Sequence, residues 1–165
     1  MSNPSAEKIV RKVHSEKKIK TVLTAYSYVA TVFSMLVFAY MLFYFTSQSI
    51  PLLIGCLITL GVPFLLVSLL RKVVNAPRPY EIYEFFDAPP KNKSGNSFPS
   101  RHCFSIFAIG TLCLFVLFPL GLITLVFGLL LCLCRVALGL HFVRDVACGA
   151  VIGVISSIIG GFILI

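Results

Sequence analysis

The residues that could do chemistry in this chain are two histidines, one aspartate and several cations that gather at the ends of apolar segments. In chain order they are Arg71, Lys72, Arg78, Ser100, Arg101, His102, Arg135, His141 and Asp145. Ionisable groups at membrane depth are energetically costly, and they indicate a functional site by default. Guanidinium groups neutralise phosphoryl oxygens through paired hydrogen bonds, so this combination favours phosphoryl transfer.

The two histidines and the aspartate could supply the reacting groups. Asp145 follows His141 by four residues, so on a helical turn its carboxylate would fix the imidazole tautomer and stabilise positive charge. His102 would then be free to protonate the leaving oxygen. The segment 97–102, Ser-Phe-Pro-Ser-Arg-His, places cap-type serines and a proline at a helix start, where backbone N–H groups could cradle an anion.

Long apolar segments must position these residues. The chain has 165 residues, of which 58% are hydrophobic and 12% charged, about half the charged fraction of a soluble domain. Five runs are long enough to cross about 30 Å of hydrocarbon; they are 22–46, 50–70, 102–118, 120–140 and 146–165. Because no strand alternation appears, we predict an all-α fold, a polytopic transmembrane helix bundle of about five spans.

The connections between the runs predict where the polar residues meet. Very short connections join the first run to the second and the third to the fourth, so each pair is expected to be antiparallel neighbours. The one long connection, about 71–101, has the length of a functional loop and carries an aromatic and acidic stretch at 80–87. That stretch suits interfacial anchors or the admission of a lipid tail. Up-down connectivity brings this catalytic-side loop and the other polar ends to one mouth of the bundle.

The last run carries small residues at four-residue spacing: Gly149, Gly153, Ser157 and Gly161. Small residues on one helix face allow another helix to approach closely. The same spacing continued backwards reaches Asp145 and then His141. We therefore expect the packing face of this helix to lead into the polar mouth.

The basic residues suit a membrane and a phosphate rather than nucleic acid. The net charge is +8, but it is spread over the N-terminal segment and the loops, with no separate basic domain for a nucleic-acid partner. Residues 1–21 form the N-terminal segment, a helix on the membrane surface or a frayed tail, and 22–165 form the transmembrane domain. The first twenty residues do not resemble a cleaved signal peptide. The six cysteines lie in or beside apolar runs and indicate packing, not a disulfide framework.

Three short motifs follow one another along the chain. They are Arg71 with Arg78-Pro79 after six residues, then Pro99-Ser100-Arg101-His102, and last Cys134-Arg135 with His141 after five residues and Asp145 after three more. In order, spacing and position they resemble the motifs of the type 2 phosphatidic acid phosphatase (PAP2) superfamily, Lys-x6-Arg-Pro, Pro-Ser-Gly-His and Ser-Arg-x5-His-x3-Asp. The resemblance covers about residues 50–165. Members commonly have six spans, and this chain shows five.

The resemblance implies a role for each motif residue. His141 would be the nucleophile that forms phosphohistidine, Asp145 its partner and His102 the general acid. The residues that would bind phosphate are Arg71, Arg78, Ser100 and Arg135, with Lys72 a rival to Arg71 for the family's Lys position. Arg101 stands where the family has Gly and could reach a second phosphate, whereas Cys134 in place of Ser loses a good donor. The family needs no metal, and the sequence shows no carboxylate cluster to hold one, so we expect no cofactor.

The function that we predict is hydrolysis of a membrane lipid phosphate: phosphatidic acid, phosphatidylglycerophosphate or undecaprenyl diphosphate. One alternative is a vanadate-dependent haloperoxidase, but that relative is expected to be soluble and larger. Another is a catalytically silent lipid-binding or transport protein, against which the intact His102, His141 and Asp145 argue. The sequence carries no signal for an oligomeric state.

Charge also predicts sidedness. With five spans, the N-terminus and the mouth lie on one side, and that side holds every Lys and Arg of the chain. The positive-inside rule therefore places the mouth in the cytoplasm, which favours phosphatidic acid or phosphatidylglycerophosphate on the inner leaflet. Bacterial relatives often act on the outer face, where diphosphate carriers are recycled, and this analogy favours a mouth on the outside.

Overall fold

The computed structural model describes residues 4–83 and 94–164, and the regular secondary structure of these residues is entirely helical. The helices are α1 (Pro4–Ser15), α2 (Lys17–Gln48), α3 (Ile50–Val74), α4 (Pro79–Ile82), α5 (Arg101–Val116), α6 (Phe118–Ala137) and α7 (Val143–Leu164). The predicted all-α bundle is confirmed. Of the aromatic and acidic stretch predicted at 80–87, residues 84–87 lie outside the described residues, as do Lys91 and Lys93.

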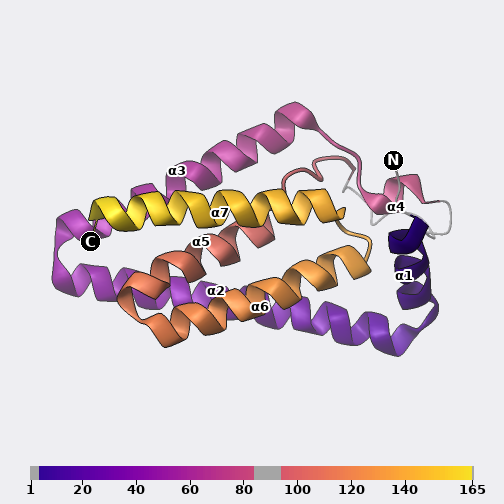
Figure 1. Cartoon of the computed structure of the whole chain (residues 1–165), viewed down its shortest axis with the longest axis horizontal. Helices are drawn as coiled ribbons and strands as arrows, with labels where there is room; N and C mark the ends of the chain where they lie inside the picture. The colour runs from indigo at the N-terminus through magenta and orange to yellow at the C-terminus, as the bar shows by residue number, and fades with distance from the viewer. Residues whose placement is uncertain (1–3, 84–93, 165) are drawn as a thin grey trace.

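Four helical stretches of the described residues are long and apolar enough to cross a membrane: Lys17–Gln48, Ile50–Ile82, Phe118–Ala137 and Val143–Ile163. The second of these stretches includes both α3 and α4. The remaining predicted span, 102–118, is the third along the chain and corresponds to α5, which has 16 residues. At 1.5 Å per residue it is about 24 Å long, shorter than the hydrocarbon thickness. It lies inside the bundle and packs against α2, α3, α6 and α7 (Figure 1). The sequence therefore predicts the place of each apolar helix, but not that the third is a short central one.

The helices run antiparallel along the chain, as predicted. Single residues, Ser49 and Leu117, join α2 to α3 and α5 to α6. At the first of these turns Leu52 N–H bonds to Ser49 Oγ at 3.4 Å, so the serine caps α3. Figure 1 shows both turns and the C-terminus at one end of the bundle. The opposite end, here called the mouth, gathers α1, α4 and the connection from α6 to α7.

Because α5 is short, its N-terminal end lies below the mouth, at a buried position here called the recess. Since α5 and α6 share their turn at the far end, the N-terminus of α5 lies inside the bundle and below the mouth (Figure 1). The residues just before it, Ser97 and Ser100, are fully buried. Polar side chains from this loop therefore meet the other ends of the bundle away from the surface.

The predicted helix bounds differ from the observed ones at the mouth. α2 begins at Lys17 rather than at 22, and α3 continues to Val74 rather than ending at 70. Hydropathy marks only the part of a helix in hydrocarbon, whereas lysine and arginine stems let a helix extend into the headgroup layer. At α6 the error is opposite, because the helix ends at Ala137 rather than at 140.

The basic N-terminal segment is a helix followed by the first turn of α2. α1 breaks at Glu16, whose backbone is extended with φ −109° and ψ 95°. Val10 and Val13 are buried, and α1 packs against α2 and α6. Figure 1 shows α1 lying across the mouth, at a steep angle to the bundle. Its location on a membrane surface, and a domain boundary at residue 21, remain predictions.

The small residues of α7 bring it against the backbone of α5, as the four-residue spacing predicts. A Cβ on Gly149 would lie 2.5 Å from the carbonyl oxygen of Ser100, and one on Gly153 would lie 2.5 Å from that of Phe104. One turn further, Ser157 Oγ donates to the Ala108 carbonyl at 2.8 Å. Any larger residue at the two glycines would push the helices apart.

Candidate active site

The loop that precedes α5 is held by polar groups from the end of α3 and from α4. Gly95 N–H donates to Glu81 Oε1 at 2.6 Å, and Asn96 N–H donates to Asn75 Oδ1 at 3.2 Å. Both loop residues are left-handed, with φ of 63° and 54°. Ser97 N–H then donates to the Ala76 carbonyl at 2.9 Å. These bonds set the path of the chain into the recess.

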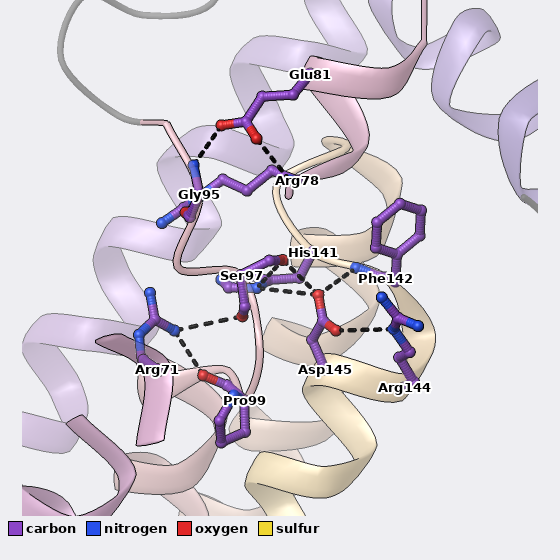
Figure 2. Close-up of polar contacts among 10 residues, drawn as sticks. All are labelled: Arg71, Arg78, Glu81, Gly95, Ser97, Pro99, His141, Phe142, Arg144 and Asp145. Atoms are coloured by element: carbon purple, nitrogen blue, oxygen red, sulfur yellow. Dashed lines mark hydrogen bonds and ion pairs between the residues drawn. The ribbon is translucent and has the colours of Figure 1, made fainter. Parts of the chain in front are cut away.

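Arg71 lies beneath this loop and is 6% exposed. Its Nη1 donates to the carbonyls of Pro99 at 2.6 Å and Ser97 at 3.4 Å (Figure 2). A guanidinium has five N–H donors, and these bonds use one nitrogen, so Arg71 can hold the loop and still offer donors to an anion. Lys72, its rival in the sequence, is exposed. The structure thus places Arg71 with the other motif residues and leaves Lys72 outside them.

Arg78 is the N-cap residue of α4, and Pro79 follows at the first helical position. Its Nε donates to the Gly95 carbonyl at 3.0 Å, and its backbone N–H donates to Glu81 Oε2 at 3.1 Å. Glu81 therefore joins the start of α4 to the loop (Figure 2). Arg78 thus contacts the loop that leads to the second motif. Its role in phosphate binding is a prediction that this position suits.

His141 and Asp145 are both buried, with 3% and 0% of their side chains exposed. His141 Nδ1 lies 3.7 Å from Asp145 Oδ2, which is contact but longer than a good hydrogen bond. Ser97 Oγ lies 3.4 Å from that nitrogen and donates to the same carboxylate oxygen at 2.5 Å. Figure 2 shows the three side chains pointing at one another. Ser97 thus bridges the pair, a role that the sequence did not predict.

The end of α6 explains how His141 reaches this position. Gly139 has φ 66°, and its N–H donates to the Val136 carbonyl at 2.9 Å. Leu140 N–H donates to the Arg135 carbonyl at 3.0 Å, which completes a Schellman motif. His141 N–H bonds to the same carbonyl at 3.3 Å. The turn therefore fixes His141 against Arg135, although the two are six residues apart.

Asp145 also has a structural part at the start of α7. Its Oδ2 accepts a hydrogen bond from Phe142 N–H at 3.0 Å, the reach-back half of a capping box. Its Oδ1 lies 3.5 Å from Arg144 Nε, and its own carbonyl accepts from Ser100 N–H at 2.9 Å. The last bond joins the second motif to the third. Contacts of its side chain and of its backbone carbonyl therefore hold Asp145 in place before any substrate binds.

Three buried polar atoms at this junction have no hydrogen-bond partner within residues 4–83 and 94–164: Ser100 Oγ, Arg135 Nε and Asp145 Oδ1. Buried polar groups in native proteins are nearly always hydrogen-bonded, so the two that can donate, Ser100 Oγ and Arg135 Nε, indicate a place for a ligand oxygen. These two residues belong to the predicted phosphate-binding set. Cys134 beside Arg135 is buried.

The environment of His141 suits a neutral nucleophile. Burial lowers the pKa of its imidazole below the usual histidine value, and the nearby Asp145 carboxylate opposes this in part. The ring therefore stays uncharged at neutral pH. With Nδ1 facing Ser97 and Asp145, Nε2 is the nitrogen left for attack.

Arg101 and His102 are the first two residues of α5 and are exposed. Both line a cavity of about 520 Å³ between α2, α3 and α5, here called the α2–α3–α5 groove. The groove is lined mainly by apolar side chains, among them Phe38, Leu60 and Phe64. The Arg101 guanidinium carbon lies 6.0 Å from the centroid of the Phe64 ring. A long apolar groove thus ends at a histidine and an arginine of the second motif.

Sequence reasoning missed the residues that support the motifs. Ser97 was included only as part of a helix-start segment, and Glu81 only as part of an acidic stretch. Asn75 carried no prediction, although an Asn two residues before a proline is a typical helix end. Its αL conformation, with φ 43°, ends α3 and presents its side chain to the loop. No group of three or more His, Cys, Asp or Glu side chains in residues 4–83 and 94–164 could hold a metal ion.

Comparisons with known proteins match the region that contains these residues. The family model for the PAP2 superfamily matches residues 52–160. The crystal structure of LpxE from Aquifex aeolicus is similar with a TM-score of 0.70 and 24% identity, covering 93% of this chain and 92% of that one. A PAP2-type phosphatidylglycerolphosphate phosphatase from Bacillus subtilis has a TM-score of 0.71 and 22% identity, covering 96% and 84%. The comparison with curated proteins gave no match.

Proposed function

The chain belongs to the PAP2 superfamily and is an integral membrane phosphatase, and we propose that it hydrolyses a lipid phosphate through a phosphohistidine at His141. The observation that carries this proposal is the contact of buried His141 with Asp145 and Ser97, beside the N-terminus of α5. A neutral imidazole with one nitrogen oriented and the other open is the form that a histidine nucleophile needs. The resemblance predicted the first two of these residues, and the contact with Ser97 adds the third.

The proposed reaction has two steps. His141 Nε2 attacks the phosphorus, the bond to the leaving oxygen breaks, and His102 gives that oxygen a proton. In the second step His102 takes a proton from water, the water oxygen attacks the phosphorus, and inorganic phosphate leaves with His141 restored. Arg71, Arg78 and Arg135 would neutralise the oxygens of the transferred group. Asp145 would stabilise the positive charge on the imidazole in the intermediate.

The α2–α3–α5 groove supports a lipid as the substrate. Two of the helices that line it, α2 and α3, are long enough to span the bilayer, so an alkyl chain could enter from the membrane without crossing water. Apolar walls with a few polar groups at one end are typical of sites for amphipathic ligands. An acyl or prenyl chain in the groove would have its headgroup beside His102.

The charge distribution supports a cytoplasmic mouth. α1 and the first turn of α2 carry six basic side chains at the mouth end, and all six are exposed: Lys8, Arg11, Lys12, Lys17, Lys18 and Lys20. The positive-inside rule then places the site on the inner leaflet. A single cysteine at Ser94 in a Cys-free variant tests this. A membrane-impermeant maleimide should leave it unlabelled in intact cells, and labelling without lysis would place the mouth outside.

Phosphate release by the purified protein tests the function itself. The panel contains phosphatidic acid, phosphatidylglycerophosphate, and prenyl mono- and diphosphates, each in excess EDTA. We expect release from at least one lipid, because arginines and histidines of the chain supply the charge that a metal would otherwise supply. Orthovanadate, which resembles the five-coordinate transition state, should inhibit. No release from any lipid would favour a silent lipid-binding protein, and activity restored only by magnesium would contradict the metal-free mechanism.

A further inference from the structure

The arginines around the site differ in what they already contact. Arg71 is buried and bonds to loop carbonyls, and Arg78 bonds to the Gly95 carbonyl. Arg101 is exposed at the start of α5, and within residues 4–83 and 94–164 its one described contact is the ring of Phe64. Its guanidinium donors are therefore available to a ligand. The family motif has Gly at this position, so the side chain is also an addition to the usual site.

The position of Arg101 defines what part of a ligand it would meet. Arg101 and His102 both line the polar end of the α2–α3–α5 groove. His141, which would receive the phosphoryl group, is buried behind the loop with Ser97 and Asp145. A lipid with its chain in the groove and its terminal phosphate at His141 would have the chain-side part of its headgroup at the groove end that Arg101 lines.

We propose that Arg101 is a specificity-determining residue that binds a second phosphate of the substrate, located between the lipid chain and the phosphoryl group that His141 accepts. The proposal rests on the function proposed above. A guanidinium fork matches two phosphate oxygens, and the ring of Phe64 beneath it restricts where the fork lies. Lipids with such a group include prenyl diphosphates and glycerophospholipids whose headgroup ends in a phosphomonoester. Phosphatidic acid and prenyl monophosphates lack it.

The second phosphate also alters the leaving group. With a diphosphate, His141 takes the terminal phosphoryl group, the bridging P–O bond breaks, and the leaving group is a lipid monophosphate. The charge that develops on its oxygens would lie beside Arg101, whose guanidinium would stabilise it. With a monophosphate the leaving group is an alkoxide and requires the proton from His102. Arg101 should therefore favour a diphosphate through both binding and the leaving group. For phosphatidylglycerophosphate, whose leaving group is also an alkoxide, it should act only by binding the phosphodiester.

Two matched pairs of lipids test the proposal on the purified full chain. One pair is a prenyl diphosphate and the corresponding monophosphate, and the other is phosphatidylglycerophosphate and phosphatidic acid with the same acyl chains. We expect the wild type to have a higher kcat/KM for the two-phosphate member of one pair. In Arg101→Gln the ratio of the two values should fall about tenfold, as for the loss of a charge-assisted hydrogen bond. Arg101→Lys should restore part of the ratio.

Controls separate this result from other causes. Lys20→Gln removes one exposed positive charge from the mouth end, away from the groove, and should leave the ratio unchanged. If Arg101→Gln does not fold, Phe64→Leu removes the ring beneath the guanidinium and should lower the same ratio. An unchanged ratio in the folded variant, or a wild type that prefers the monophosphate in both pairs, would overturn the proposal. A wild type that hydrolyses neither member of either pair would instead reject the proposed function.

Discussion

The two faces of α5 differ sharply in how they pack. Towards α7 there is no space, because a Cβ on Gly149 would lie 2.5 Å from the Ser100 carbonyl oxygen. Towards α2 and α3 the same helix lines a cavity of about 520 Å³. A Cβ added to Gly61, which also lines this groove, would meet no neighbouring atom within 4 Å. One short helix therefore has a closed face and an open face. The contacts among His141, Asp145 and Ser97 lie at the end of the closed face, and His102 lines the open face.

The difference suggests how one helix serves two requirements. The reacting groups must be held within a fraction of an ångström, and the closed face does this by bonding Ser100 N–H to the Asp145 carbonyl at 2.9 Å. A lipid chain needs a deformable apolar surface instead, which the open face provides. Changes to the closed face should accordingly reduce catalysis or stability, whereas changes to the open face should alter substrate binding.

The largest effect is expected on the closed side from Asp145→Asn. The amide is uncharged and cannot stabilise a positive imidazole, whereas its oxygen in the place of Oδ2 could still accept from Ser97 and Phe142 N–H. By analogy with the aspartate of a catalytic triad, kcat should fall by about 10³–10⁴-fold. Single-turnover phosphate release measures this loss. A decrease below tenfold in a folded variant would show that Asp145 only caps α7.

Gly149→Ala tests whether the close approach of α7 and α5 is required. The added methyl group would meet the Ser100 carbonyl, so we expect a loss of about 1–3 kcal/mol in stability, as in other overpacked cores. Thermal unfolding in detergent should show a lower Tm. Gly61→Ala on the open face is the matched control, with no decrease expected. Equal Tm values for the two variants would contradict the packing difference.

Gly61→Leu tests the open face by filling the α2–α3–α5 groove. The added side chain should compete with the lipid chain and raise KM for long-chain substrates about tenfold, the lower range of such effects in apolar pockets. A short-chain analogue should be affected less. Leu66→Phe adds bulk to an exposed part of α3 outside the groove and serves as the control. Equal increases in KM for long and short chains would exclude the groove as the chain site.

The smallest effect concerns pH. Burial lowers the pKa of His141, so the imidazole remains neutral until the pH falls below the ordinary histidine value of 6.5. The acidic limb of kcat/KM should therefore have its midpoint below pH 6.5. In Asp145→Asn the negative charge that raises the pKa of His141 is lost, so the limb should move further towards acid. A limb above pH 6.5 that His141 controls would contradict its buried, uncharged state.

The sequence predicts the parts of this site that depend on local spacing. Asp145 lies four residues after His141, and this close spacing predicts that the two side chains meet, although His141 lies in the turn before α7 rather than on a helical turn. Hydropathy and short connections then place the other motif ends at one mouth. The positions of Arg71, Arg78 and Arg135 near the motif loops follow from this reasoning.

The parts that the sequence did not predict depend on contacts between distant segments. Ser97 meets Asp145 across 48 residues, and Asn75 holds Asn96 through a loop conformation that no spacing rule gives. The short, central α5 was also missed, because an apolar composition suits protein interior and lipid equally. Hydropathy cannot separate a helix that faces lipid from one that other helices surround.

The most direct test of the account is to trap the phosphorylated enzyme. Purified protein is mixed with a substrate that carries a radiolabelled terminal phosphate, and the reaction is quenched within the first turnover. The wild type should retain label that acid releases and base does not, as expected for phosphohistidine. His141→Ala, confirmed as folded by its thermal transition, should retain none. Label of the same stability on the His141→Ala variant would contradict the assignment of His141 as the nucleophile.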